Sequence, residues 1–334
     1  MKTYFILTAV LYLIMMLSAV IPLTVSETES DKKTVQAVAT VYDSENKERE
    51  PEASCENIKV FRHYDKSVST VEIHDYLYGA VAAEMPVSFH DEAIKAQAVA
   101  SYTFTLWIKN NADNPSEELS DVSDDPKKHQ GYLDKQQMKD LWGDDFDINY
   151  NRIKKLVDSV YGEYISYNNE PIMAVFHSLS PGCTADASDV WKSSLPYLKS
   201  TSAPGDKLSP DYISTVSIST KEFLEKVKSC KDYNFDFSTP LLGKTEKTES
   251  GYIKTAEIYS STIDSSHLRS LFNLKSPFFT LEINKTTVTF TVYGHGHGVG
   301  MSQYSADYMA RQSSDYKQIL SHFYNGTEIV KEEQ

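Results

Sequence analysis

The chain has 334 residues and a formal net charge of −14, from 47 acidic and 33 basic side chains. Proteins that bind nucleic acid need a basic face to meet phosphates, so this balance argues against a nucleic-acid partner but leaves an uncharged sugar substrate open. The three cysteines are an odd number, which allows one disulfide bridge at most, and the sequence does not identify the pair.

The N-terminal segment is apolar and uncharged from Tyr4 to Val25, after a single basic residue, Lys2. Its length is close to the ~20 residues of a membrane-spanning helix and exceeds the core of a typical signal peptide. Cleavage at Thr24-Val25-Ser26 remains an alternative. We expect residues 1–25 to be an uncleaved single-pass anchor, with the N-terminus in the cytoplasm and the body on the outer side of the membrane.

The rest of the chain divides by composition. Residues 26–54 are polar and charged, which predicts a solvated linker. Residues 55–330 are long enough to form an ectodomain with a substantial core. The ectodomain opens with two predicted strands, Ile58–Phe61 and Val68–Ile73, around a polar turn.

The next stretch is centred on Glu84, which follows a run of small residues and precedes Met85-Pro86. Pro86 disfavours helical geometry at Met85, so a break is predicted there, followed by a helix over Phe89–Lys109. A carboxyl group at such a break, among apolar neighbours, loses hydration. Its pKa rises and it can hold a proton near neutral pH, as a general acid must. For an isolated glutamate, a capping or ion-paired role is the more frequent alternative.

Residues 110–130 form a polar insertion that we interpret as a surface loop. His129 is the one borderline ligand in its last part, whereas a zinc site needs three or four, so no metal is expected there. Further elements are predicted in the order helix 136–142, helix 148–161, hairpin 164–176, strand 213–218, helix 223–228, strand 244–259, helix 262–272, hairpin 278–293, helix 302–312 and helix 315–324.

Two histidine-containing segments stand at predicted strand ends. His177-Ser178 ends the first hairpin and is followed by Pro-Gly, which suggests side chains delivered to the edge of a cleft. Gly294–Gln303 alternates glycine and histidine and leads into a helix with Ser302 as its candidate cap. It lacks the Gly-Lys-Ser/Thr ending of a phosphate loop, and its His-x-His pair has no evident third metal ligand.

Several motifs occur in an order and spacing that resemble the stage II sporulation protein D family, whose relatives include the amidase enhancers. They are Tyr76-Leu77-Tyr78-Gly79, Ala82-Ala83-Glu84-Met85-Pro86, Glu92–Ala100, His177–Gly182 with Asp189-Val190-Trp191, and Gly296–Gln303. The resemblance also selects Tyr197 and Lys199, which accompany the glutamate in the family's activity. Where the family often has arginine, this chain has Tyr102.

The resemblance implies an α+β fold in which a helical lobe carries the catalytic Glu84 and a β-rich lobe faces it across a cleft. It implies a peptidoglycan lytic transglycosylase without a cofactor, which acts in forespore engulfment together with a peptidoglycan amidase and a polytopic membrane protein. The substrate-binding residues expected on this basis are Tyr197, Lys199, His177, Ser178, Tyr102, Gln97, His297, Ser302 and Gln303.

The residues agree with that chemistry without requiring it. Ordinary glycosidases use two carboxyl groups, whereas a lytic transglycosylase uses one, and no partner for Glu84 stands out; Asp189 is the best remaining candidate. One alternative is a non-catalytic glycan-binding module that enhances an amidase. Another is a zinc hydrolase that uses His177, His295 and His297.

Overall fold

The computed structural model describes residues 57–111, 120–191 and 193–332. This part of the chain is a mixed α+β structure with several small sheets, which confirms the α+β class, while the expected two lobes with a cleft between them stay a prediction. The expected anchor, residues 1–25, and the expected linker, residues 26–54, lie outside the described residues. None of the helices in the described ranges has both the length and the hydrophobicity that crossing a bilayer requires.

The first sheet has the order β2-β1-β3. Strand β1 (Asn57–Phe61) pairs antiparallel with β2 (Val68–Glu72), as predicted, and in parallel with β3 (Val122–Ser123). The chain then enters α3 (Ile73–Glu84) without a connecting loop, so the β2 strand leads directly to Glu84.

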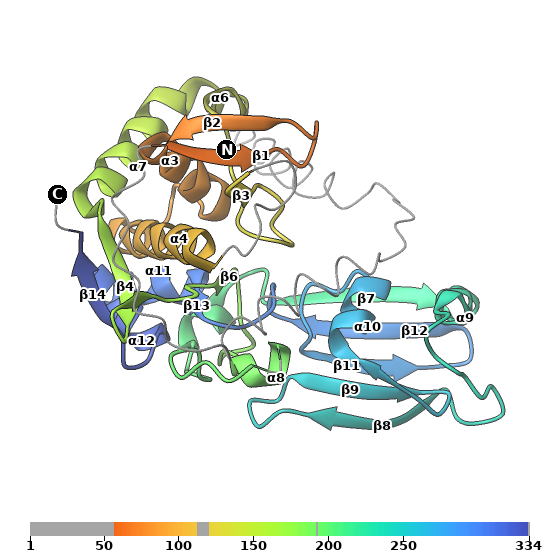
Figure 1. Ribbon diagram of the computed structural model, residues 1–334. Helices are drawn as coiled ribbons and strands as arrows, with labels where there is room; N and C mark the ends of the chain where they lie inside the picture. Colours follow the sequence, from red (N-terminus) through yellow and green to blue (C-terminus); the bar gives the residue numbers. More distant parts are fainter. Residues whose placement is uncertain (1–56, 112–119, 192, 333–334) are drawn as a thin grey trace, which may run out of the picture. The chain divides into compact units, whose positions relative to one another are not determined.

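Helix α3 packs against other helices in this part of the chain (Figure 1). Helix α3 ends at Glu84, and Met85 has an extended backbone (φ −127°, ψ 132°), which confirms the break predicted from Pro86. Helix α4 (Asp91–Asn111) confirms the second predicted helix and is the central one: it contacts α3, α7 (Phe146–Val160), α11 (Gln303–Arg311) and α12 (Tyr316–Phe323). The short helices α6 (Lys135–Trp142) and η2 (Gly143–Asp145) precede α7.

The predicted hairpin after α7 is only partly correct. Strand β4 (Glu163–Tyr167) pairs with β5 (Glu170–Pro171) and with β14 (Glu328–Lys331) near the chain end. The chain leaves this sheet after β5, because Ala174 and Val175 donate their N–H groups to carbonyls two residues back and form tight turns. Strand β6 (Phe176–His177) instead pairs in parallel with β13 (Met301–Ser302).

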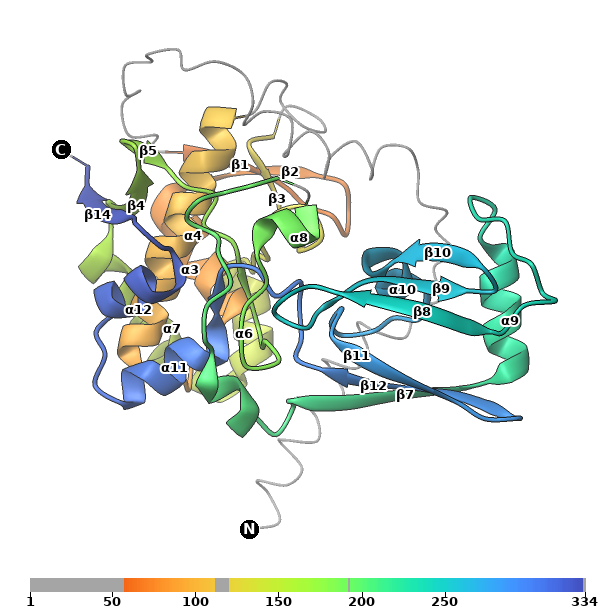
Figure 2. The same cartoon turned by 90° about the horizontal axis from the view of Figure 1, so that it is seen from below.

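Two three-stranded sheets share a second hydrophobic core (Figures 1 and 2). One contains β8 (Leu242–Lys247), β9 (Ile253–Ile258) and β10 (Ser261–Asp264), and the other contains β7 (Ile213–Ser219), β11 (Phe279–Ile283) and β12 (Thr287–Tyr293). Helices α9 (Thr220–Ser229) and α10 (Ser265–Leu271) complete this core, in which Phe223 and Phe272 stack with ring centroids 4.9 Å apart.

Two predictions in this region are wrong. The single strand expected over 244–259 is a pair, β8 and β9, because the chain reverses at Gly251, which has a positive φ of 88°. The helix expected over 262–272 begins as β10, and only Ser265–Leu271 is helical. The remaining short helices are α8 (Ala187–Trp191) and η3 (Pro204–Leu208).

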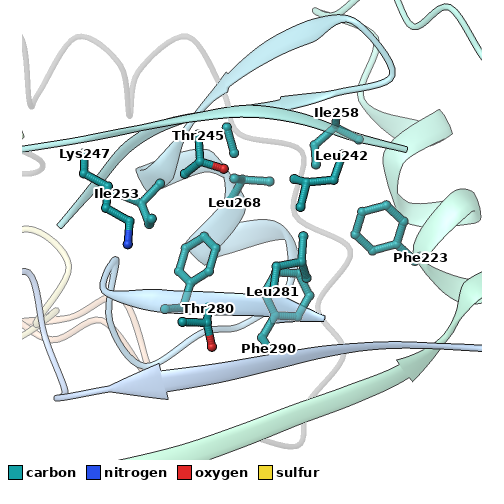
Figure 3. A pocket seen from close by; sticks show the side chains of 12 residues that line it. Phe223, Leu242, Thr245, Lys247, Ile253, Ile258, Leu268, Thr280, Leu281 and Phe290 are labelled. Atoms are coloured by element: carbon teal, nitrogen blue, oxygen red, sulfur yellow. The ribbon is translucent and has the colours of Figure 1, made fainter. Parts of the chain in front are cut away.

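An apolar cavity of about 260 Å³ lies within this second core (Figure 3). Its walls come from both three-stranded sheets and from α9 and α10, and include Phe223, Leu268 and Phe290. Lys247 is the one ionisable side chain in its lining, so the cavity lacks the groups that acid–base chemistry on a sugar would need.

Candidate functional site

Glu84 is half-buried at the C-terminal end of α3. The backbone N–H of Gly131 donates to its Oε1 atom at 2.5 Å, and the side chain of Gln303 also donates a hydrogen bond to the carboxyl group. Burial raises the pKa of this carboxyl above its ordinary value, while the two hydrogen bonds oppose the rise because they favour the charged form. The raised pKa is the direction that the sequence predicted.

Of the predicted binding residues, Gln303 adjoins Glu84 and Gln97 adjoins Gln303. Gln303, the first residue of α11, donates from Nε2 to Oε1 of Gln97 on α4 at 3.2 Å. Gln97 in turn donates to Oγ of Ser101 at 3.0 Å, and both glutamines are buried. Gln303 thus links Glu84 at the end of α3 to Gln97 on α4, although α11 is far from these two consecutive helices in sequence.

The roles of Gln130 and Gly131 were not predicted from the sequence. We assigned Gln130 to the end of a surface loop, yet it is buried, and Gly131 supplies the backbone donor to Glu84. The one local signal was the small residue next to a polar one, which is too common in loops to indicate a site.

Ser302 has a structural role that depends on Asp206. Ser302 caps α11, as predicted, and its hydroxyl donates to Asp206 Oδ1 at 2.6 Å. The Ser180 N–H donates to Asp206 Oδ2, also at 2.6 Å, and Asp206 is fully buried within η3. No motif predicted that this aspartate joins the two histidine-containing segments.

Replacing Asp206 with alanine should lower the free energy of unfolding by about 2–4 kcal/mol, because two buried donors lose a charged acceptor. Asp236 is a matched control: it accepts one backbone N–H and one hydroxyl, both from Ser238, but it is exposed. Asp236→Ala should therefore cost less than about 1 kcal/mol. Urea denaturation of both variants measures the difference, and equal losses would contradict the role given to Asp206.

The histidines of the two segments lie near each other and are neutral at neutral pH. Burial is the main cause that lowers the pKa of His177, His295 and His297. The rings of His177 and His297 are 5.8 Å apart, and His297 is 5.4 Å from the Trp191 ring. The neutral His177 donates from Nδ1 to the Val299 carbonyl at 3.1 Å, and its Nε2 is buried without a hydrogen-bond partner in the described structure.

The remaining predicted residues are tied to protein groups. Tyr197 is buried, and its hydroxyl accepts the Met173 N–H at 3.3 Å. Lys199 is partly exposed and forms an ion pair with Asp186, with Nζ and Oδ2 3.2 Å apart.

Tyr102 is also buried, and its hydroxyl donates to Glu332 Oε2 at 2.7 Å, so this hydroxyl is committed to the C-terminal segment. Ser178 is half-buried, and its carbonyl accepts the N–H of Tyr304 in α11. In the ranges that the structure describes, no group of three or more His, Cys, Asp or Glu side chains is arranged to hold a metal ion.

Comparisons with known proteins agree with the resemblance. Residues 62–167, which include Glu84, Gln97 and Gly131, match the stage II sporulation protein family model. Stage II sporulation protein D of Bacillus amyloliquefaciens is 36% identical over 298 residues, which cover 87% of this chain and 83% of that protein. The chain belongs to the stage II sporulation protein D family.

Two further relatives extend this assignment. Stage II sporulation protein D of Bacillus subtilis (strain 168) is 37% identical over 279 residues, which cover 83% of this chain and 80% of the relative. The amidase enhancer of the same strain is 26% identical over 306 residues, which cover 76% of this chain and 40% of that longer protein. The similarity to stage II sporulation protein D thus extends well beyond the part that contains Glu84.

Proposed function

We propose that this member of the family is a lytic transglycosylase that cleaves the MurNAc–GlcNAc strands of peptidoglycan during sporulation. The observation that carries the proposal is the environment of Glu84: a desolvated carboxyl with a raised pKa that is still partly exposed to solvent. Desolvation causes the rise in pKa, two hydrogen bonds oppose it, and no second carboxylate among the described residues contributes to it. One proton-holding carboxyl group suits a reaction in which the substrate supplies its own nucleophile.

In the proposed reaction, Glu84 gives its proton to the glycosidic oxygen as the bond from that oxygen to C1 of N-acetylmuramic acid breaks. The C6 hydroxyl oxygen of the same sugar forms a bond to C1, and its proton passes to the Glu84 carboxylate. The products are a 1,6-anhydro sugar end and a sugar with a free hydroxyl, and Glu84 is protonated again. The donors from Gly131 and Gln303 stabilise the carboxylate between the two proton transfers.

We place the glycan in a cleft between the helices around Glu84 and the β-rich part of the chain. Lys199 would hydrogen-bond sugar hydroxyls, and the partly exposed Ser178 and His297 would line the same cleft, whereas Tyr197 and His177 are buried and would lie behind its surface. We also propose that residues 1–25 anchor the body on the outer side of a membrane. The partners would be a peptidoglycan amidase that removes stem peptides first and a polytopic membrane protein.

Product analysis tests the activity. The purified full-length protein is incubated with glycan strands that carry or lack stem peptides, and the new ends are weighed by mass spectrometry. Anhydro ends, more abundant from stem-free strands, are expected. Hydrated reducing ends would indicate a hydrolase instead.

The alternative is a non-catalytic module that binds glycan and enhances an amidase. The relative named amidase enhancer supports this reading. Such a module would leave both kinds of glycan strand uncleaved while still binding them, which sedimentation with the strands would reveal.

The activity should fall as pH rises, because the acid must be protonated and its protonated fraction is lost through the raised pKa of Glu84. The hydrogen bond from Gln303 lowers that pKa, so Gln303→Leu should raise it and move the alkaline limb of the pH–rate profile to higher pH. Gln312→Leu, at the exposed C-terminal end of the same helix, should leave the limb in place. A limb that moves to lower pH in Gln303→Leu would contradict this assignment.

A further inference from the structure

Residues 130–133, which we call the 130–133 strap, lie along α3 beside Glu84. The Gly131 N–H donates to the Glu84 carboxyl, and the Leu133 N–H donates to the Gly79 carbonyl at 3.2 Å. The Tyr132 ring stacks on Tyr76 with centroids 5.4 Å apart. Gly79 permits this approach, since a Cβ there would lie 2.2 Å from the Leu133 carbonyl oxygen.

The Gln130 side chain holds the first residue of the strap. It is 1% exposed, and its Nε2 atom lies 2.9 Å from the Tyr76 hydroxyl on α3, 3.0 Å from the Thr105 hydroxyl and 3.2 Å from the Ser101 carbonyl on α4. The Ser101 carbonyl can only accept, so the Nε2 atom of the amide faces these oxygens as the donor. One side chain thus fastens the strap to both helices that position Glu84.

We propose that Gln130 is a positioning residue that fixes the strap so that the Gly131 N–H points at the Glu84 carboxyl. Gln130 is too deeply buried to touch a substrate and acts through the backbone of its neighbour. The space beside that backbone is small: a Cβ on Gly131 would lie 3.0 Å from Glu84 Oε1. The expected effect on catalysis rests on the proposed function. The expected effect on the pKa of Glu84 does not.

The sign of the effect follows from which form of Glu84 the donor favours. The Gly131 N–H stabilises the carboxylate and lowers the pKa of Glu84 against the larger effect of burial. A loosened strap weakens this hydrogen bond, so the pKa should rise further. The protonated form then persists to higher pH.

Gln130→Met tests the proposal, because methionine has a similar length and no hydrogen-bonding amide. The full-length protein is labelled with ¹³C at the glutamate carboxyl carbons, and the Glu84 resonance is identified by its loss in Glu84→Gln. We expect the Gln130→Met variant to titrate at a pH about one unit higher than the wild type. The alkaline limb of the pH–rate profile should move by the same amount, with KM unchanged.

Thr103→Val is the matched control. Thr103 lies on α4, is buried like Gln130, and loses two hydrogen bonds on substitution, with the Val99 carbonyl and the Ile165 N–H, but it does not contact the strap. It should destabilise the protein without moving the Glu84 titration. If Gln130→Met does not fold, Gln130→Asn keeps the amide on a shorter side chain and should give a smaller shift in the same direction.

An unchanged titration in the Gln130 variants, or an equal shift in Thr103→Val, would overturn the proposal. The shift in titration supports the positioning role even if the wild type yields no anhydro products. In that case the proposed function fails and the positioning of the carboxyl group stands.

Discussion

Substitution of Glu84 by glutamine should reduce the formation of anhydro-ended products by about 10²–10⁴-fold, the usual contribution of a general acid–base group. Glutamine has nearly the same shape, and its carbonyl oxygen can still accept the Gly131 N–H. It has no carboxyl proton to transfer to the leaving oxygen and cannot take one from the C6 hydroxyl. The rate of appearance of anhydro ends, followed by mass spectrometry, measures the loss.

The control for this variant lies at the opposite end of the same helix. Glu72 precedes α3, is exposed, and makes no capping hydrogen bond with its side chain, so Glu72→Gln should cleave at the wild-type rate. Thermal unfolding of both variants checks that the fold is kept. Wild-type cleavage by Glu84→Gln would remove Glu84 from the chemistry and leave another group to be found.

Replacement of Gly300 by alanine should cause the largest loss of stability. Gly300 has a φ of 73°, and a Cβ there would lie 2.0 Å from the Val175 carbonyl oxygen, a backbone atom that cannot easily move. The unfavourable backbone conformation costs about 1–3 kcal/mol. The steric conflict should add roughly 1–3 kcal/mol, as overpacking does in other proteins.

Gly162→Ala separates these two costs. Gly162 has a similar φ of 80°, but a Cβ would meet no atom within 4 Å. Gly162→Ala should lower the free energy of unfolding only by the conformational cost. In urea denaturation, the midpoint of Gly300→Ala should therefore lie clearly below that of Gly162→Ala. Equal midpoints would show that the backbone at Val175 can shift to accommodate the added Cβ atom at little cost in free energy.

The elements that depend on local signals were predictable. Pro86 predicts the end of α3 at Glu84, and the helical spacing of apolar residues predicts α4. The turn at Asn284–Thr287 lies between two alternating runs, and its hairpin is present as predicted.

What failed depends on contacts between distant residues. The β6–β13 pairing joins Phe176–His177 to Met301–Ser302, and no local periodicity reveals it. The polar residues of β8 and the turn at Gly251 were read as part of one strand, although only the pairing with β9 defines the hairpin.

The same limit applies to the site. Gln97 and Gln303 were selected because they lie in motifs, and the structure places Gln303 beside both Glu84 and Gln97. Asp206 and Gln130 were missed because their importance comes from burial and from hydrogen-bond partners elsewhere in the chain. Local sequence shows which residues are available, whereas packing decides which of them are desolvated.

The distance in sequence between Glu84 and Gln303 has a consequence for biosynthesis. Synthesis proceeds from the N-terminus, so Glu84 is made long before α11, the helix that begins with its hydrogen-bond donor Gln303. A nascent or truncated chain that ends before α11 lacks the Gln303 side chain, so the Glu84 carboxyl group has no hydrogen bond from that residue. Only a chain that includes α11 therefore gives Glu84 both of the donors that favour its charged form.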